Sequence, residues 1–214
     1  AFQNYADVFA KLGYPVKLDF TSIFSPQGGN IRILPPEIGT KKAFQEWIGV
    51  APFAAHKQKV YPPEMLEKMI TMLTKEHPSC RVFIFGKGPL EDPIINGIVS
   101  RNPQCLNASA VLNGISQELV LMSHLDVMVS MDSANMHFAS LVNTPVVSIW
   151  GATHPYAGFM GWGQNEHNAV QIDLACRPCS IFGNKPCLRG DLACMRNISP
   201  EMVYERVKQV LNKK

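Results

Sequence analysis

The sequence lacks any long apolar segment: no run approaches the roughly 20 residues that a membrane-spanning helix requires, although 46% of its 214 residues are hydrophobic. It also lacks clusters of Lys and Arg, and its formal net charge is only +3, which argues against a nucleic-acid-binding protein. The first residues, AFQNYADVFAKLG, contain an acid and no apolar block, which argues against a signal peptide. With only 17% charged residues, the chain has the composition of a packed domain.

Cysteine is sparse outside one stretch. Cys80 and Cys105 are isolated, whereas the other four cysteines lie within residues 176–194. Because nothing in the sequence points to export, we expect a reducing, cytoplasmic environment. The chain does not begin with Met, so we expect it to be a piece of a longer protein.

The chain changes character near residue 44. We expect a short helix at 4–12, ended by Gly13, and then an irregular segment rich in Pro and Gly with one short strand at 31–34. Residues 1–44 are therefore predicted to be the remnant of a preceding domain and a linker.

Residues 45–214 alternate between short apolar segments and helical patterns, which is typical of βαβ units. The predicted strands are 47–51, 81–85, 126–131, 145–149 and 169–172. The expected fold class is α/β: a Rossmann-like parallel sheet with flanking helices.

Three helix starts can be predicted from the residues that precede them. Pro62 and Pro63 open a helix with one apolar stripe, because proline is favoured in the first turn. We expect Ser116 to cap a second helix, and Ser199 to open the last one.

The segment 131–137, MDSANMH, follows an apolar strand and precedes a helix. In open α/β sheets ligands bind where a strand ends and a helix begins, and the free N–H groups there favour phosphate. Asp132, Ser133, Ala134 and His137 are therefore candidate binding residues. Asp132 suits an anion site poorly, and it could instead cap the helix or orient Lys59 or His137; equally, His137 could be a core histidine.

Two further strand exits carry polar residues. Residues 51–62 place Lys57 and Lys59 on a loop before a helix, where a lysine suits phosphate, although an exposed basic loop is the simpler interpretation. Gly86 and Gly88 allow a tight exit from the next strand, and Glu91 is placed to accept hydrogen bonds from ribose hydroxyls. This glycine pattern is also common in turns without ligands.

The remaining constellation is C-x2-C-x7-C-x6-C, formed by Cys176, Cys179, Cys187 and Cys194. Four thiolates can close a tetrahedral zinc site, and the first spacing is common in such sites. Reduced buried thiols, or disulfides formed on oxidation, are the alternatives.

Taken in this order, the segments from residue 47 to the final helix resemble the C-terminal domain of glycosyltransferase family 9, the ADP-heptose:lipopolysaccharide heptosyltransferases. The family pattern Asp-Ser/Thr-Gly-x-x-His, then T-P-V-x-x-x-[FW]-G-x-T, is matched by residues 132–137 and 144–153, with Ala134 in place of glycine. The family elements Lys-x-Trp-Pro and C-x-P-C correspond to residues 59–62 and 176–179. Ala54 and Ala55 stand where the family often has hydroxyl residues.

This resemblance implies a GT-B architecture in which two Rossmann-like domains face each other across the active site. It implies an inverting enzyme that needs no metal or other cofactor, with Lys59, Glu91, Asp132, Ser133, Ala134 and His137 at the nucleotide-sugar site. ADP-heptose is the implied donor and a lipopolysaccharide-type glycan the implied acceptor. The acceptor site and general base would lie in a second domain, so we expect this chain alone to be inactive. A contact with the inner face of the bacterial inner membrane is a further expectation.

Other functions remain open from the residues alone. A sugar-nucleotide epimerase of GT-B architecture would need acid and base groups on both faces of the sugar. A dehydrogenase domain would need GxGxxG after the first strand, which this chain lacks. A non-enzymatic zinc-bearing interaction module would depend on the four clustered cysteines.

Overall fold

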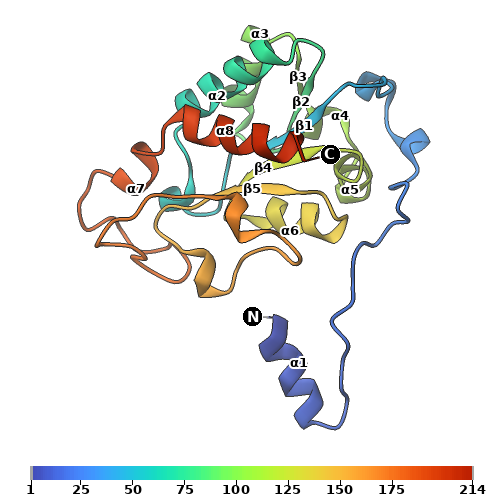
Figure 1. The fold of residues 1–214 in the computed structure, drawn as a ribbon. Coiled ribbons are helices and arrows are strands. Elements are labelled where there is room, and N and C mark those ends of the chain that lie inside the picture. Colours follow the sequence, from blue (N-terminus) through green and yellow to red (C-terminus); the bar gives the residue numbers. More distant parts are fainter. Residues whose placement is uncertain (1, 214) are drawn as a thin grey trace.

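The computed structural model describes residues 2–213 and shows a single six-stranded parallel sheet (Figure 1). The strand order is β3-β2-β1-β4-β5-β6, and every neighbouring pair is parallel. The strands are β1 (Trp47–Ala51), β2 (Arg81–Ile84), β3 (Cys105–Asn107), β4 (Val127–Met131), β5 (Val146–Ile149) and β6 (Ala169–Val170). Since β1 and β4 are neighbours while β2 and β3 extend to one side, the strand order reverses between β1 and β4.

Helices cover both faces of the sheet. The α-helices are α1 (Phe2–Lys11), α2 (Pro63–Glu76), α3 (Asp92–Arg101), α4 (Ala108–Val111), α5 (Ile115–Met122), α6 (Ala134–Leu141), α7 (Ala193–Arg196) and α8 (Pro200–Leu211). The 3-10 helices are η1 (Ile31–Ile33), η2 (Pro36–Ile38), η3 (Lys57–Lys59), η4 (Pro155–Ala157) and η5 (Glu166–Asn168). None of the described helices is long and apolar enough to cross a membrane.

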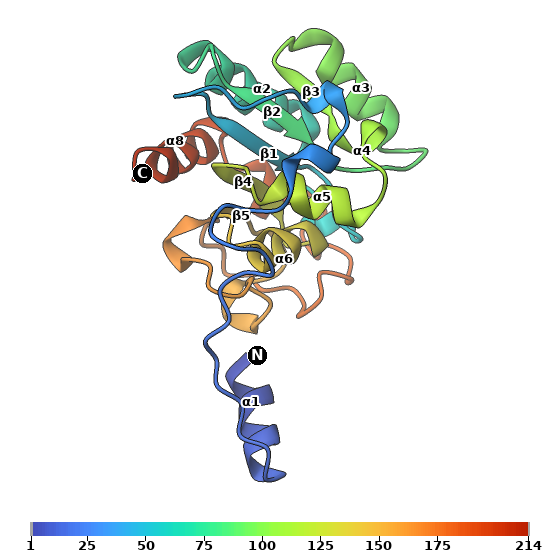
Figure 2. The ribbon, with the colours of Figure 1, turned by 90° about the vertical axis from the view of Figure 1, so that its right-hand side faces the viewer.

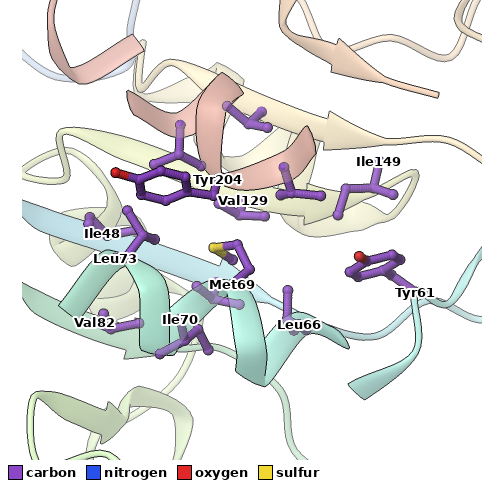
Figure 3. Packing of buried hydrophobic residues seen from close by; sticks show 14 of the residues in the cluster. Ile48, Tyr61, Leu66, Met69, Ile70, Leu73, Val82, Val129, Ile149 and Tyr204 are labelled. Carbon is purple, nitrogen blue, oxygen red and sulfur yellow. The ribbon is translucent and has the colours of Figure 1, made fainter. Parts of the chain in front are cut away.

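One face of the sheet is packed by α2, α3 and α8. Of the predicted stripe of α2, Met65 is partly buried and the other four residues are fully buried there. Figure 3 shows three of these four, Leu66, Met69 and Leu73, within the cluster. Tyr61 lies in the same layer, and its hydroxyl donates to the Ile198 carbonyl over 2.9 Å. This bond satisfies the buried polar group and ties the loop after β1 to the segment before α8.

The other face is packed by α4, α5 and α6. We call the cluster on the α2 and α8 side the first core and the cluster on this side the second core. Alternate residues of a strand point to opposite faces. Trp47 and Ala51 of β1 therefore belong to the second core, and Ile48 and Val50 belong to the first. Burial on both faces explains why the strands are continuously apolar in sequence.

The N-terminal helix α1 lies away from the sheet (Figures 1 and 2). Its Phe2 ring meets Trp162 edge-on at 5.0 Å, and the Trp162 indole N–H donates to the Phe20 carbonyl. Further along, residues 31–38 pack on the second core, where Ile38 is fully buried. The division of the chain at residue 44 stays a prediction.

Several local features differ from the predictions. Residues 31–34 do not form a strand, because the Asn30 side chain accepts from the Arg32 amide over 3.2 Å and starts η1 instead. Ser116 does not cap α5, because Gly114 takes a positive φ of 80° and the helix begins at Ile115. Strand β3 was missed because three residues carry too little pattern to predict, and β6 is shorter than the predicted 169–172.

Candidate nucleotide-sugar site

A pocket of about 500 Å³ lies at the carboxyl ends of β1, β2 and β4, and it includes the point where the strand order reverses. Open α/β sheets bind ligands at such a point because loops diverge there. The pocket is lined by Phe53, Ala54, Ala55, His56, Lys59, Phe85, Gly86, Glu91, Asp132, Ser133, Ala134, Asn135, His137, Phe159, Ile181 and Phe182. The structure therefore brings all six predicted site residues together around one space.

Asp132 lies at the centre of a buried polar network. Its Oδ2 stands 3.2 Å from the Lys59 ammonium and accepts a 2.8 Å hydrogen bond from the Thr153 hydroxyl. Asp132 and Thr153 are buried, and Lys59 keeps only 14% of its side chain exposed. Among the alternatives left open by the sequence, the carboxylate thus orients Lys59 and does not cap α6.

The residue that caps α6 is Ser133, in extended conformation, and its side chain makes no capping bond. Its hydroxyl instead lies 3.2 Å from the Ser130 hydroxyl. Because the first N–H groups of a helix have no partner within the helix, the start of α6 presents donors and the positive end of the helix dipole to the pocket.

His137 lies one turn into α6 and is half-buried. Burial lowers the pKa of its imidazole below the usual range; Asp132 acts against this shift, and Lys59 adds to it. At neutral pH the ring is therefore uncharged, and it can donate one hydrogen bond and accept another.

The loop after β1 separates its two lysines. Lys57 is exposed and lies outside the lining of the pocket, whereas Lys59 at the end of η3 points its ammonium inward. Ala54, Ala55 and His56 line the wall beside it.

Glu91 stands at the other end of the pocket, immediately before α3, and its side chain makes no capping bond. The turn that places it depends on Gly86, whose φ is 154°; a Cβ there would stand 3.0 Å from the Glu91 carboxylate. The Gly86 amide donates to Ser109, whose hydroxyl donates to Glu118. These bonds fix the strand exit, and Glu91 lines the pocket beside it.

Sequence reasoning missed Thr153 and the apolar wall of Phe159, Ile181 and Phe182. Asp132 directly follows β4 and Thr153 lies four residues after the end of β5, so the position of Thr153 in the loop after a strand was a usable signal. The wall had no such signal, because its residues come from two irregular loops.

The four clustered cysteines are free thiols; Cys176, Cys179 and Cys187 are half-buried and Cys194 is buried. Burial raises the pKa of Cys194, whereas the backbone N–H of Leu192 lowers the pKa of Cys187. Within residues 2–213, no group of three or more His, Cys, Asp or Glu side chains is arranged to hold a metal ion. The zinc site stays a prediction.

Comparison with known proteins places these features in a family. The model of glycosyltransferase family 9 (heptosyltransferase) matches residues 33–185, which is more than half of the chain. Lipooligosaccharide heptosyltransferase 2 of Campylobacter jejuni subsp. jejuni is 27% identical over 133 residues, which cover 61% of this chain and 40% of that protein. This chain thus spans less than half of the length of the curated relatives it matches.

Solved structures share the fold. The E. coli ADP-heptose LPS heptosyltransferase II superposes with a TM-score of 0.62 at 19% identity, over 83% of this chain and 50% of that one. A glycosyl transferase family 9 protein from Veillonella parvula gives 0.66 at 15% identity, over 98% and 59%. The E. coli heptosyltransferase WaaC, solved with ADP, gives 0.63 at 16% identity, over 95% and 54%. The predicted fold class, the Rossmann-like half of a GT-B protein, is confirmed.

Proposed function

The chain belongs to glycosyltransferase family 9, and on that premise we propose that it is the donor-binding part of an inverting, metal-independent heptosyltransferase. The donor is a nucleoside-diphosphate heptose, with ADP as the nucleotide, and the acceptor is a glycan of the lipopolysaccharide type. The reaction takes place at the cytoplasmic face of the inner membrane, where the enzyme makes a peripheral contact with the lipid.

The observation that carries this proposal is the meeting of the Lys59 ammonium with the start of α6 in one pocket. When the glycosidic bond breaks, negative charge develops on the leaving diphosphate. A fixed ammonium and the N–H groups at Ser133 and Ala134 stabilise that charge without a metal ion, because they are already oriented before the reaction. Ala134, where the family has glycine, is small enough to let the backbone approach the phosphate.

The lining residues of the pocket set the orientation in which the donor binds. Glu91 accepts hydrogen bonds from the ribose hydroxyls at the β2 end, and the diphosphate lies between Lys59 and α6. His137, uncharged at neutral pH, donates a hydrogen bond to a phosphate oxygen or to the sugar.

The general base and the acceptor site belong to a second domain of the complete enzyme. Among the described residues that line the pocket, the carboxylates are Glu91 and Asp132. The Oδ2 atom of Asp132 is already paired with the Lys59 ammonium and the Thr153 hydroxyl, so this oxygen is not free to take a proton from an acceptor. Glu91 lies at the ribose end, away from the anomeric carbon.

Calorimetry with ADP, GDP and UDP, each with and without EDTA, tests the proposal. We expect ADP to bind best, with equal affinity in both conditions, and no sugar transfer by this chain alone. Binding that requires a divalent cation, or transfer by the isolated chain, would contradict it.

A pair of lysine variants tests the site itself. Lys59→Ala should weaken ADP binding by roughly 1.5–3 kcal/mol, the range for a charge-assisted hydrogen bond. Lys57→Ala is the matched control, because it removes the same charge from the same loop but outside the pocket. Equal losses in the two variants would mean that the loop acts only through its general charge.

A further inference from the structure

One wall of the pocket takes no part in the donor contacts proposed above. Phe159, Ile181 and Phe182 line this wall. Phe159 follows η4 in the segment between β5 and β6. Ile181 and Phe182 belong to the cysteine loop, residues 176–194, which runs into the start of α7 (Figure 1).

The two phenylalanines form a tilted pair. Their ring centroids are 5.6 Å apart and their planes cross at 55°. Phe159 packs partly against the second core, but Phe182 and Ile181 keep 56% and 59% of their surface exposed. Apolar side chains held exposed at the rim of a polar pocket are typical of a ligand-binding surface.

Hydrogen bonds within the loop and contacts with other loops fix the position of this wall. The Cys179 amide donates to the Ala152 carbonyl over 2.9 Å, and the Gly183 amide donates to the Ser180 hydroxyl over 2.8 Å. Gly183 is buried, with a φ of 73°, and a Cβ on it would stand 2.6 Å from Cγ of Lys59. Phe182 is therefore held next to the residue that receives the diphosphate.

The strand order assigns this wall to one end of the donor. A nucleotide sugar is linear, with the diphosphate between the nucleoside and the sugar. Glu91 follows β2, Lys59 follows β1 and Asp132 follows β4, so the proposed ribose and diphosphate contacts run in that direction along the sheet edge. The next loops, after β5 and β6, carry Phe159 and Phe182, so the sugar comes to lie at the aromatic wall.

We infer that Phe159 and Phe182 form the sugar-recognition wall of the donor pocket and select a neutral sugar through the C–H face of its ring. This inference rests on the proposed function. The rings offer apolar surface to carbon-bound hydrogens, and burying a sugar carboxylate against them would remove its water without supplying a partner. The wall thus favours a heptose or hexose over a uronic acid.

The test compares the affinity for ADP with that for ADP-heptose and ADP-glucose, measured by calorimetry on this chain. The wild-type protein should bind at least one of the two sugar nucleotides more tightly than ADP. Phe182→Ala should reduce that gain by about three- to tenfold, the range for a lost aromatic contact, and should leave ADP affinity unchanged. Phe182→Tyr keeps the ring and should keep the gain.

Leu188→Ala is the matched control, because Leu188 is 90% exposed on the same loop and lies outside the pocket; it should behave as wild type. If wild-type protein binds no nucleotide, the proposed function fails and this inference falls with it. If ADP binds but the sugar adds no affinity, or if Phe182→Ala weakens ADP and sugar nucleotides equally, the inference alone is overturned.

Discussion

The Thr153 hydroxyl donates to Asp132 over 2.8 Å, and this bond joins the loop after β5 to the short link between β4 and α6. Both side chains are buried. The carboxylate oxygen that accepts this bond is also the one that pairs with Lys59. The position of the ammonium in the pocket therefore depends on a hydroxyl some 20 residues beyond the acid.

Thr153→Val keeps the shape of the side chain and removes the donor, so we expect the folded state to lose about 1–3 kcal/mol of stability, since a buried carboxylate loses a partner. ADP affinity should also fall, by about fivefold, because Lys59 is no longer held in one position. Denaturant unfolding and calorimetry measure the two effects.

Thr144→Val is the matched control: Thr144 is equally buried and donates to the Met122 carbonyl away from the pocket. It should lose stability without losing ADP affinity, and parallel losses in both variants would make Thr153 a purely structural residue.

Gly183→Ala and Gly190→Ala form a second matched pair. Both glycines have a φ near 75°, so alanine should cost each variant about 1 kcal/mol of stability. Only at Gly183 does the new methyl meet the Lys59 side chain; nothing lies within 4 Å of a Cβ at Gly190. We expect calorimetry to show weaker ADP binding for Gly183→Ala alone. Unchanged binding in that variant would mean that the cysteine loop moves away from Lys59 without consequence.

The pH dependence of the free energy of unfolding should show the contribution of the neutral His137 side chain. Since burial lowers the pKa of His137 in the folded state, protonation favours the unfolded state. The stability that the neutral ring contributes is complete above the unfolded pKa of about 6.5 and is lost as the pH falls below it. Urea unfolding at pH 7.5 and pH 5.5 should therefore show a smaller acid-induced loss for His137→Gln than for wild type. Asn135→Ala on the same helix turn removes no titrating group and should keep the wild-type loss; identical losses in all three proteins would refute this role of burial.

Cysteine reactivity should differ between the core and the loop. Burial raises the pKa of Cys80 to about 11 and that of Cys105 to about 12, so both thiols are protonated at pH 8. The backbone N–H of Leu192 lowers the pKa of the half-buried Cys187, which enriches its thiolate. A short iodoacetamide pulse read by mass spectrometry should label Cys187 first, and labelling of Cys80 at the same rate would contradict this.

The same labelling experiment tests the zinc prediction. A metal ion held by the four loop cysteines would protect all of them until a chelator is added. Unfolded protein, in which all six thiols should react, is the control for complete labelling.

Much of the fold could be predicted from local pattern. The stripe of α2 and the capping residue of α8 depend on neighbours within a few residues, so the sequence alone specifies them. The predicted strands 47–51 and 126–131 lie where the structure has β1 and β4. The carboxyl ends of parallel strands lie at the same edge of a sheet, which is why Lys59, Glu91 and residues 132–137 could be predicted to lie near one another. The predictions at Ser116 and 31–34 are wrong because turn geometry at Gly114 and Asn30 overrides the local pattern.

What only the tertiary structure decided is which partner each polar group takes. The sequence left Asp132 as a cap or as an orienting group, and the choice depends on Thr153 and Lys59, which reach it from the loops after β5 and β1. In the same way, Phe182 reaches the pocket because Gly183 packs against the Lys59 side chain more than 120 residues earlier in the chain. A sequence pattern encodes which face of an element is apolar, but the distance between two loops depends on strand order and packing, and those are properties of the folded chain as a whole.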